Sequence, residues 1–220
     1  AKAVAESAAA GLAAILANVL ITRWLDMENG THLETHWGLT LNAMPWLILM
    51  LMQLYRARIG GPLTKLRYAL AGLGGVIAAG GIGLAATLGN PLFAYSPDQT
   101  GALVRGPLVL DSLLLAYGIP GLILGLAAWK LPLMRRLRLG FAALGAALLA
   151  FYAGLEIRRF WQGDWLGIPG VPQPELYTYT LALMLLGAGL LYQAIASRSA
   201  PLRRIAMAVI ALVVAKVFLL

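Results

Sequence analysis

Long apolar runs recur along the whole chain, and short polar connections separate them. The chain has 220 residues, of which 60% are hydrophobic and only 12% are charged, and its mean hydropathy is +0.80. A soluble domain of this size covers its surface with charged side chains, and this composition does not supply enough of them. The runs themselves are long enough to cross a bilayer, whose hydrocarbon core of about 30 Å requires roughly 20 mostly apolar residues in a helix.

Helices are the expected form of these runs, because backbone amides in lipid must be hydrogen-bonded within their own segment. We therefore predict an all-α fold, a polytopic transmembrane helix bundle with about seven spans. The predicted spans are approximately residues 3–25, 39–55, 68–88, 108–129, 139–160, 177–196 and 205–220.

Basic residues gather in alternate connections between these spans. Residues 55–68, 130–139 and 197–205 contain bases and no acid, whereas most of the acids lie in the other connections. The positive-inside rule then places the basic connections and the N-terminus on the cytoplasmic side of the membrane. The same bases, lying beside lipid headgroups, account for the net charge of +8, so no nucleic-acid partner is expected.

Two stretches of the chain are alike at a period of about 136 residues. In this alignment Arg23 and Trp24 fall on Arg159 and Phe160. The period contains four spans, an even number, so the two copies would have the same orientation in the membrane. The predicted organisation is a first repeat unit at 1–105, a linking span at 106–138 and a second repeat unit at 139–220.

Several segments of the second half carry a resemblance to a known family. The segments are "LEIRRFW" at 155–161, "ELYTYT" at 175–180, "SRSAPLRRIAMAVIALVVAKVFLL" at 197–220 and "GPLVLDSLLLAYGIPGLILGLAA" at 106–128. They resemble bacterial polytopic membrane proteins catalogued as domain of unknown function 2339. The resemblance implies a multi-pass helical topology and a piece of a longer protein with further spans. It implies no activity.

Glu156 lies near the end of an otherwise apolar span. An ionised carboxylate at that depth costs a few kcal/mol unless it is compensated, so we expect it to face protein or water. Arg159, one turn further along the helix, and Lys216, the base within the last span, are the expected partners. The group is either an ion pair that fixes helix register or a ligand or proton site in an outward-facing cavity.

Aromatic side chains crowd the connections that lack basic clusters. They form either the interfacial aromatic belt of a membrane protein or, beside acids and Arg105, a surface that holds a sugar or a lipid-linked glycan. Combined with the charged group above, they give a candidate substrate-binding set: Glu156, Arg159, Lys216, Asp111, Trp161, Trp165, Glu175 and Tyr177.

Other motifs are interpreted as structural. "THLETH" at 31–36 is not a zinc-protease motif and fits a polar connection, and no metal or cofactor is predicted. Gly72, Gly75, Gly80 and Gly83 are interpreted as small residues that allow close helix packing. No serine triad is visible, because no histidine is expected to lie near Ser112 or Ser7.

The leading functional hypothesis is an inner-membrane protein that binds or moves an amphiphilic envelope substrate, a lipid or a lipid-linked glycan, through an outward-facing cavity. One alternative is a membrane-embedded enzyme that transfers or hydrolyses a group on a lipid-linked glycan, with Glu156 or Asp111 as the base. Another is a non-catalytic scaffold. The partners expected are the lipid bilayer, a lipid or glycan ligand, and other membrane subunits or the rest of a longer chain.

Overall fold

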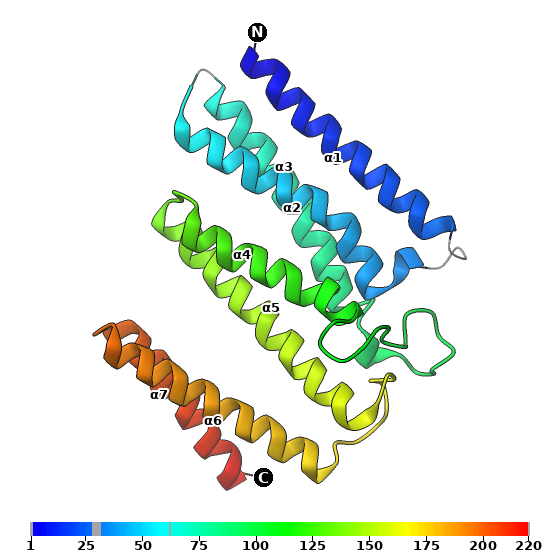
Figure 1. The fold of residues 1–220 in the computed structure, drawn as a ribbon, viewed down its shortest axis with the longest axis vertical. Helices are drawn as coiled ribbons and strands as arrows, with labels where there is room; N and C mark the ends of the chain where they lie inside the picture. Colours follow the sequence, from blue (N-terminus) through cyan, green and yellow to red (C-terminus); the bar gives the residue numbers. More distant parts are fainter. Residues whose placement is uncertain (1, 28–31, 62, 220) are drawn as a thin grey trace. The chain divides into compact units, whose positions relative to one another are not determined.

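A computed structural model describes residues 2–27, 32–61 and 63–219, and these are helical apart from the turns and loops that join the helices (Figure 1). Within these residues the α-helices are α1 (Lys2–Met27), α2 (His36–Ile59), α3 (Thr64–Ala86), α4 (Ile119–Lys130), α5 (Arg135–Gln162), α6 (Gln173–Ala196) and α7 (Ala200–Leu219). Shorter turns are the 3₁₀ helices η1 (His32–Glu34) and η2 (Pro91–Phe93) and the π-helix η3 (Leu114–Gly118). The all-helical prediction is confirmed for the part of the chain that the structure describes.

Five of the helical segments are long and apolar enough to cross a membrane. They are Ala5–Asp26, His36–Ile59, Thr64–Phe93, Arg135–Gln162 and Gln173–Ala196. The segment expected at 108–129 forms the shorter apolar helix Leu114–Lys130. Its predicted first residues, 108–111, belong instead to a loop that side chains of α5 hold in place, as described below.

The chain divides into two compact units, Ala1–Ile168 and Pro169–Leu220. In the first unit, α2 packs against α1, α3 and η3, and α4 packs against α5. Polar contacts join α1 to α2, where Asn18 Nδ2 donates to Asn42 O at 2.8 Å and Thr22 Oγ1 donates to Asn42 Oδ1 at 2.9 Å. The second unit is the hairpin of α6 and α7.

Tyr117, in the π-turn η3, connects three helices of the first unit. Its side chain is completely buried. Its hydroxyl donates to Ala85 O of α3 at 2.6 Å. Its ring packs edge-on against Phe151 of α5, with the ring centroids 4.9 Å apart. The residue therefore closes the core at the point where the loop between α3 and α4 returns to the helices.

Glycines of α3 make a close helix contact with α2 in the first unit. A Cβ on Gly74 would lie 2.9 Å from Trp46 O, and one on Gly81 would lie 2.8 Å from the Cβ of Ala43. A Cβ on Gly72, Gly80 or Gly83 would meet no atom within 4 Å, so of the four predicted packing glycines only Gly75, beside Met50, contacts α2. The packing prediction was thus wrong for three residues, because the buried stripe of α3 follows Ala71, Gly74, Ala78, Ile82 and Ala85.

Arginines join the helices at one end of the first unit, which we call the basic end. Arg56 of α2 lies 3.8 Å from Glu6 of α1. Arg58 Nε donates to Pro132 O in the α4–α5 turn at 2.8 Å, and Arg67 Nη1 donates to Arg56 O at 3.0 Å. The start of α1 and the α2–α3 and α4–α5 turns therefore lie together, as Figure 1 also shows. The opposite end, which carries residues 87–113 and the C-terminal turn of α5, is called the loop end.

Candidate functional site

Arg159 is the main polar link at the loop end. It lies in the last turn of α5 and is 5% exposed. Its Nη1 donates to Asp111 Oδ2 at 2.6 Å, its Nη2 donates to Asp164 Oδ1 at 2.7 Å, and Nη2 also donates to Gly106 O at 2.6 Å. One guanidinium group thus binds the loop before η3 and the turn after α5. Planar, multidentate hydrogen bonding of this kind is what arginine provides and lysine does not.

Asp111 connects Arg159 to the start of the next helix. Its Oδ1 accepts the amide of Leu114 at 2.9 Å, as a helix-capping carboxylate does. Its side chain has no exposed surface. A fully buried carboxylate requires a partner, because the desolvation of an isolated charge costs several kcal/mol. Arg159 is that partner.

Glu156 lies one turn before Arg159 on α5, and it holds the backbone of Val109. Val109 has φ = 73°, which is unusual for a β-branched residue. Glu156 Oε2 accepts the Val109 amide at 3.2 Å, and Tyr152 Oη donates to Val109 O at 2.7 Å. The carboxylate near the end of the span therefore helps to hold a strained loop residue, a feature that is frequent at functional sites.

The turn after α5 pairs with the loop between η2 and η3. Val104 N donates to Asp164 O at 2.9 Å, and Leu103 and Trp165 form an isolated antiparallel bridge. Trp165 Nε1 donates to Ala94 O at 3.3 Å. Trp161 is 42% exposed and packs edge-on against Phe160. Of the two predicted tryptophans, Trp165 thus helps to close the loop.

Ser112 and His36 meet at the same end of the unit. Ser112 Oγ and His36 Nε2 lie 2.9 Å apart, and the two residues are 76 positions apart in the chain. The expectation that Ser112 lacks a neighbouring histidine was therefore wrong. No local spacing relates the two residues, and the return of the loop to the start of α2 brings them together.

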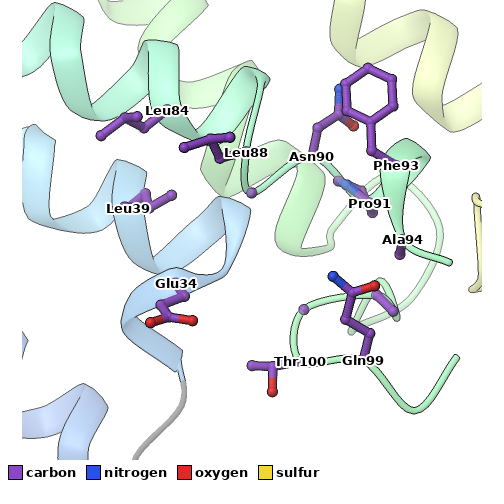
Figure 2. A pocket seen from close by; sticks show the side chains of 13 residues that line it. Glu34, Leu39, Leu84, Leu88, Asn90, Pro91, Phe93, Ala94, Gln99 and Thr100 are labelled. Carbon is purple, nitrogen blue, oxygen red and sulfur yellow. The ribbon is translucent and has the colours of Figure 1, made fainter. Parts of the chain in front are cut away.

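Hollows surround the loop at this end. One of about 370 Å³ is lined by the ends of α2 and α3 and by the loop, including Leu39, Leu84, Gln99 and Thr100 (Figure 2). A second, of about 370 Å³, lies between His32, Asp98, Arg105 and Asp164. A third, of about 360 Å³, lies beside Ser112 and is lined mainly by Trp37, Leu110, Leu114 and Leu115. The loop end therefore combines apolar and polar lining.

The remaining predicted site residues belong to the second unit. Lys216 Nζ donates to Leu176 O and to Thr180 Oγ1, each at 3.0 Å. Glu175 is completely buried and accepts the Tyr179 hydroxyl at 2.9 Å. Tyr177 is exposed, and its hydroxyl donates to Gln173 Oε1 at 3.1 Å. The pairing of Glu156 with Lys216 stays a prediction, because the two residues lie in different units.

The structure thus brings Glu156, Arg159, Asp111 and Trp165 together around one loop. The sequence pointed to the end of α5 through its unusual density of charge. It missed Tyr152, Ser112, His36 and the pairing of Arg159 with Asp164, because these contacts depend on how the loop folds back. In the described residues no group of three or more histidine, aspartate or glutamate side chains has metal-ligand geometry, and His32 instead packs its ring against Trp37 at 5.3 Å.

Comparison with known proteins supports the conclusion that the chain is a membrane protein. No curated protein and no solved structure matches the chain. One family model does, under the description "Predicted membrane protein (DUF2339)", and the match covers residues 1–220. Its full coverage includes the five span-length helices and the loop that Arg159 holds. The chain therefore belongs to the DUF2339 family of predicted membrane proteins.

Proposed function

We propose that the protein is a multi-pass protein of the bacterial inner membrane that binds an amphiphilic envelope ligand, a lipid or a lipid-linked glycan, at its loop end. In this arrangement the basic end faces the cytoplasm and the loop end faces away from it. The positive-inside rule supports this orientation, because Arg56, Arg58 and Arg67 all lie at the basic end.

The observation that carries the proposal is the hollow shown in Figure 2. Leu84 of α3 and Leu88, in the turn after α3, lie on one side of it, and Gln99 and Thr100, from the loop, lie on the other. Sites that bind amphiphiles combine an apolar wall with a few polar groups that orient the headgroup. A hollow at the ends of spanning helices also lies near the depth at which headgroups meet acyl chains.

Two features favour ligand binding over a scaffold and over an enzyme that uses Asp111 as its base. A scaffold that acts through close helix packing needs no hollows, yet several surround the loop. Asp111, considered above as the base of an enzyme, is occupied by Arg159 and by the Leu114 amide. Asp111 therefore fits a structural role better than a catalytic one.

The proposal includes seven spans and a parallel duplication with a period of about 136 residues. The α2–α3 and α6–α7 hairpins support it, since they correspond in this alignment and in each of them the two helices pack against one another. Each hairpin turn is also next to basic residues, Arg56 and Arg58 in one and Arg203 and Arg204 in the other.

Ligand titration of the purified full-length chain tests the proposal. The probes are a fluorescent phosphatidylglycerol and a polyprenyl diphosphate disaccharide. Leu88→Gln makes the apolar wall polar at a residue that is 83% exposed in the free chain, so the fold should tolerate it. We expect at least one probe to bind saturably and Leu88→Gln to weaken that binding about tenfold, the equivalent of losing roughly 1.4 kcal/mol of apolar contact.

The matched control is Tyr95→Ala. Tyr95 is 94% exposed on the same loop and does not line the hollow, so this variant should bind as the wild type does. Equal affinities for the wild type and Leu88→Gln, or the absence of saturable binding by both probes, would contradict the proposal.

A further inference from the structure

The contact between Ser112 and His36 has the geometry of a nucleophile and its base. Ser112 Oγ lies 2.9 Å from His36 Nε2 and accepts the Arg105 amide at 3.2 Å. With that amide as donor, the hydroxyl proton of Ser112 is left to point at His36. Both side chains are buried, at 5% and 0% exposed, and Ser112 also lines the hollow of about 360 Å³.

We propose that Ser112 and His36 form a serine–histidine pair that cleaves or transfers the acyl group of an anionic lipid ester bound in the hollow beside Ser112. The inference goes beyond ligand binding and rests on a different hollow from the one in Figure 2. It shares with the proposed function only the amphiphilic class of the ligand.

The start of a helix supplies a place for the developing negative charge. Ser112 is the first residue of the helical segment that continues into η3. The first amides of a helix lack partners within the helix. The Ser112 amide donates to Arg105 O, and the Leu114 amide donates to Asp111 Oδ1. In serine hydrolases the amide directly after the nucleophile stabilises the oxyanion, and the Leu113 amide has that place in the sequence.

His36 is held in place for its role as base. It is the first residue of α2, and its ring stacks at 6.4 Å on that of Tyr117. Its Nδ1 is buried and has no hydrogen-bond partner within the described residues. The pair acts when the ring proton is on Nδ1, so that Nε2 can accept the proton of Ser112.

The lining of the hollow indicates the class of substrate. Its wall is mainly apolar, from Trp37, Leu110, Leu114 and Leu115. Arg105 is on its edge, and its guanidinium group makes no hydrogen bond or ion pair with any residue that the structure describes. A mainly apolar wall with one available cation fits an acyl chain whose headgroup carries a negative charge.

The chemical steps balance without a metal or a redox partner. Ser112 Oγ bonds to the ester carbonyl carbon, and its proton moves to His36 Nε2. The carbon–oxygen bond to the alcohol then breaks, and His36 gives its proton to the departing oxygen. Water, or the hydroxyl of a second lipid, attacks the acyl-serine by the same route, which releases the acyl product and restores Ser112.

Labelling with an alkyl fluorophosphonate tests the inference on the full-length chain in native lipid. Peptide mass spectrometry should find the label on Ser112. Ser112→Ala should abolish it, and His36→Asn should slow it by at least about 100-fold, the usual contribution of a general base. The matched control Ser96→Ala, on the same loop, should label at the wild-type rate. Fatty-acid release from fluorescent phosphatidylglycerol should follow the same order.

Labelling of Ser112 in the wild type decides the test, and this measurement does not depend on the folding of any variant. A cooperatively melting wild-type chain with no label on Ser112 overturns the inference and shows that the contact only holds the loop. Ser112→Cys adds a second test, because the chain has no other cysteine and iodoacetamide should label it faster than a cysteine at Ser96. Probe binding that depends on Leu88, without labelling of Ser112, would overturn this inference and leave the proposed function intact. Labelling of Ser112 without probe binding that depends on Leu88 would overturn the proposed function and leave this inference intact.

Discussion

At the scale of single residues, Glu156 and Arg159 hold the loop end together mainly through partners distant in sequence. Glu156 accepts the amide of Val109, which is 47 positions away. Arg159 binds Asp111, 48 positions away, and Asp164, five positions away. A carboxylate and a guanidinium near the end of an apolar helix therefore act here as a clamp on the neighbouring loop.

The clamp predicts a specific pattern of stability. Arg159→Met leaves the Asp111 carboxylate buried without its partner and should lower the free energy of unfolding by about 3–5 kcal/mol. Arg159→Met combined with Asp111→Asn should recover much of the loss, since no uncompensated charge then stays buried. Thermal melting of the purified protein in detergent measures both effects.

Arg136→Met is the control for the loss of a charge from the same helix. Arg136 is exposed near the start of α5, so its removal should change the melting temperature little. If Arg159→Met melted at the same temperature as Arg136→Met, the contact with Asp111 would not contribute to stability.

The same residues show which parts of this site could be predicted from the sequence and which could not. The isolated Glu156 and the adjacent arginines are visible in sequence because charge is expensive in an apolar span. Their partners are not visible, because Asp111 and Val109 reach them only after the loop folds back on α5. Local spacing suggested Arg159 as the partner of Glu156, yet the hydrogen bonds of its guanidinium go to Asp111, Asp164 and the loop backbone.

At the scale of the elements, apolar length predicted the positions of the helices but not all of their ends. Each of the seven predicted spans overlaps a helix in the described residues. The helix Leu114–Lys130 is shorter than the span predicted there, because residues just before it belong to the loop that Arg159 binds. Composition does not distinguish apolar residues in a helix from apolar residues that tertiary contacts hold in a loop.

The α2–α3 contact offers a test that compares two neighbouring glycines. A methyl group on Gly81 would lie 2.8 Å from Ala43 Cβ and 3.3 Å from Leu39 O, whereas one on Gly80 would meet nothing within 4 Å. Gly81→Ala should therefore cost about 1–3 kcal/mol through overpacking. Gly80→Ala should be neutral or stabilise by up to about 1 kcal/mol, because alanine favours the helix.

Melting temperatures of the two variants give the comparison directly. Each replaces a glycine of α3 with the same residue, so the difference between them reports packing against α2 and not helix propensity. Equal shifts in melting temperature for the two variants would show that α3 does not approach α2 as closely as the structure describes.

At the scale of the whole molecule, the basic connections of the first unit are gathered at one end. Arg58 joins the end of α2 to the α4–α5 turn through Pro132 O, and Arg56 lies near Glu6 of α1. These arginines therefore hold the turns together. An arrangement in which alternate connections share one end is what a multi-pass membrane protein requires.

Membrane orientation is the prediction that belongs to this scale, and the chain suits its measurement because it contains no cysteine. Arg136→Cys places a thiol at the basic end, and Asp98→Cys places one on the exposed loop at the opposite end. The positive-inside rule predicts that the excess of bases keeps the basic end in the cytoplasm. In intact cells an impermeant maleimide should therefore label Asp98→Cys and not Arg136→Cys, and both should react after permeabilisation. Labelling of Arg136→Cys alone in intact cells would invert the orientation and place the Ser112 hollow on the cytoplasmic side, whereas equal labelling of both before permeabilisation would contradict a fixed topology.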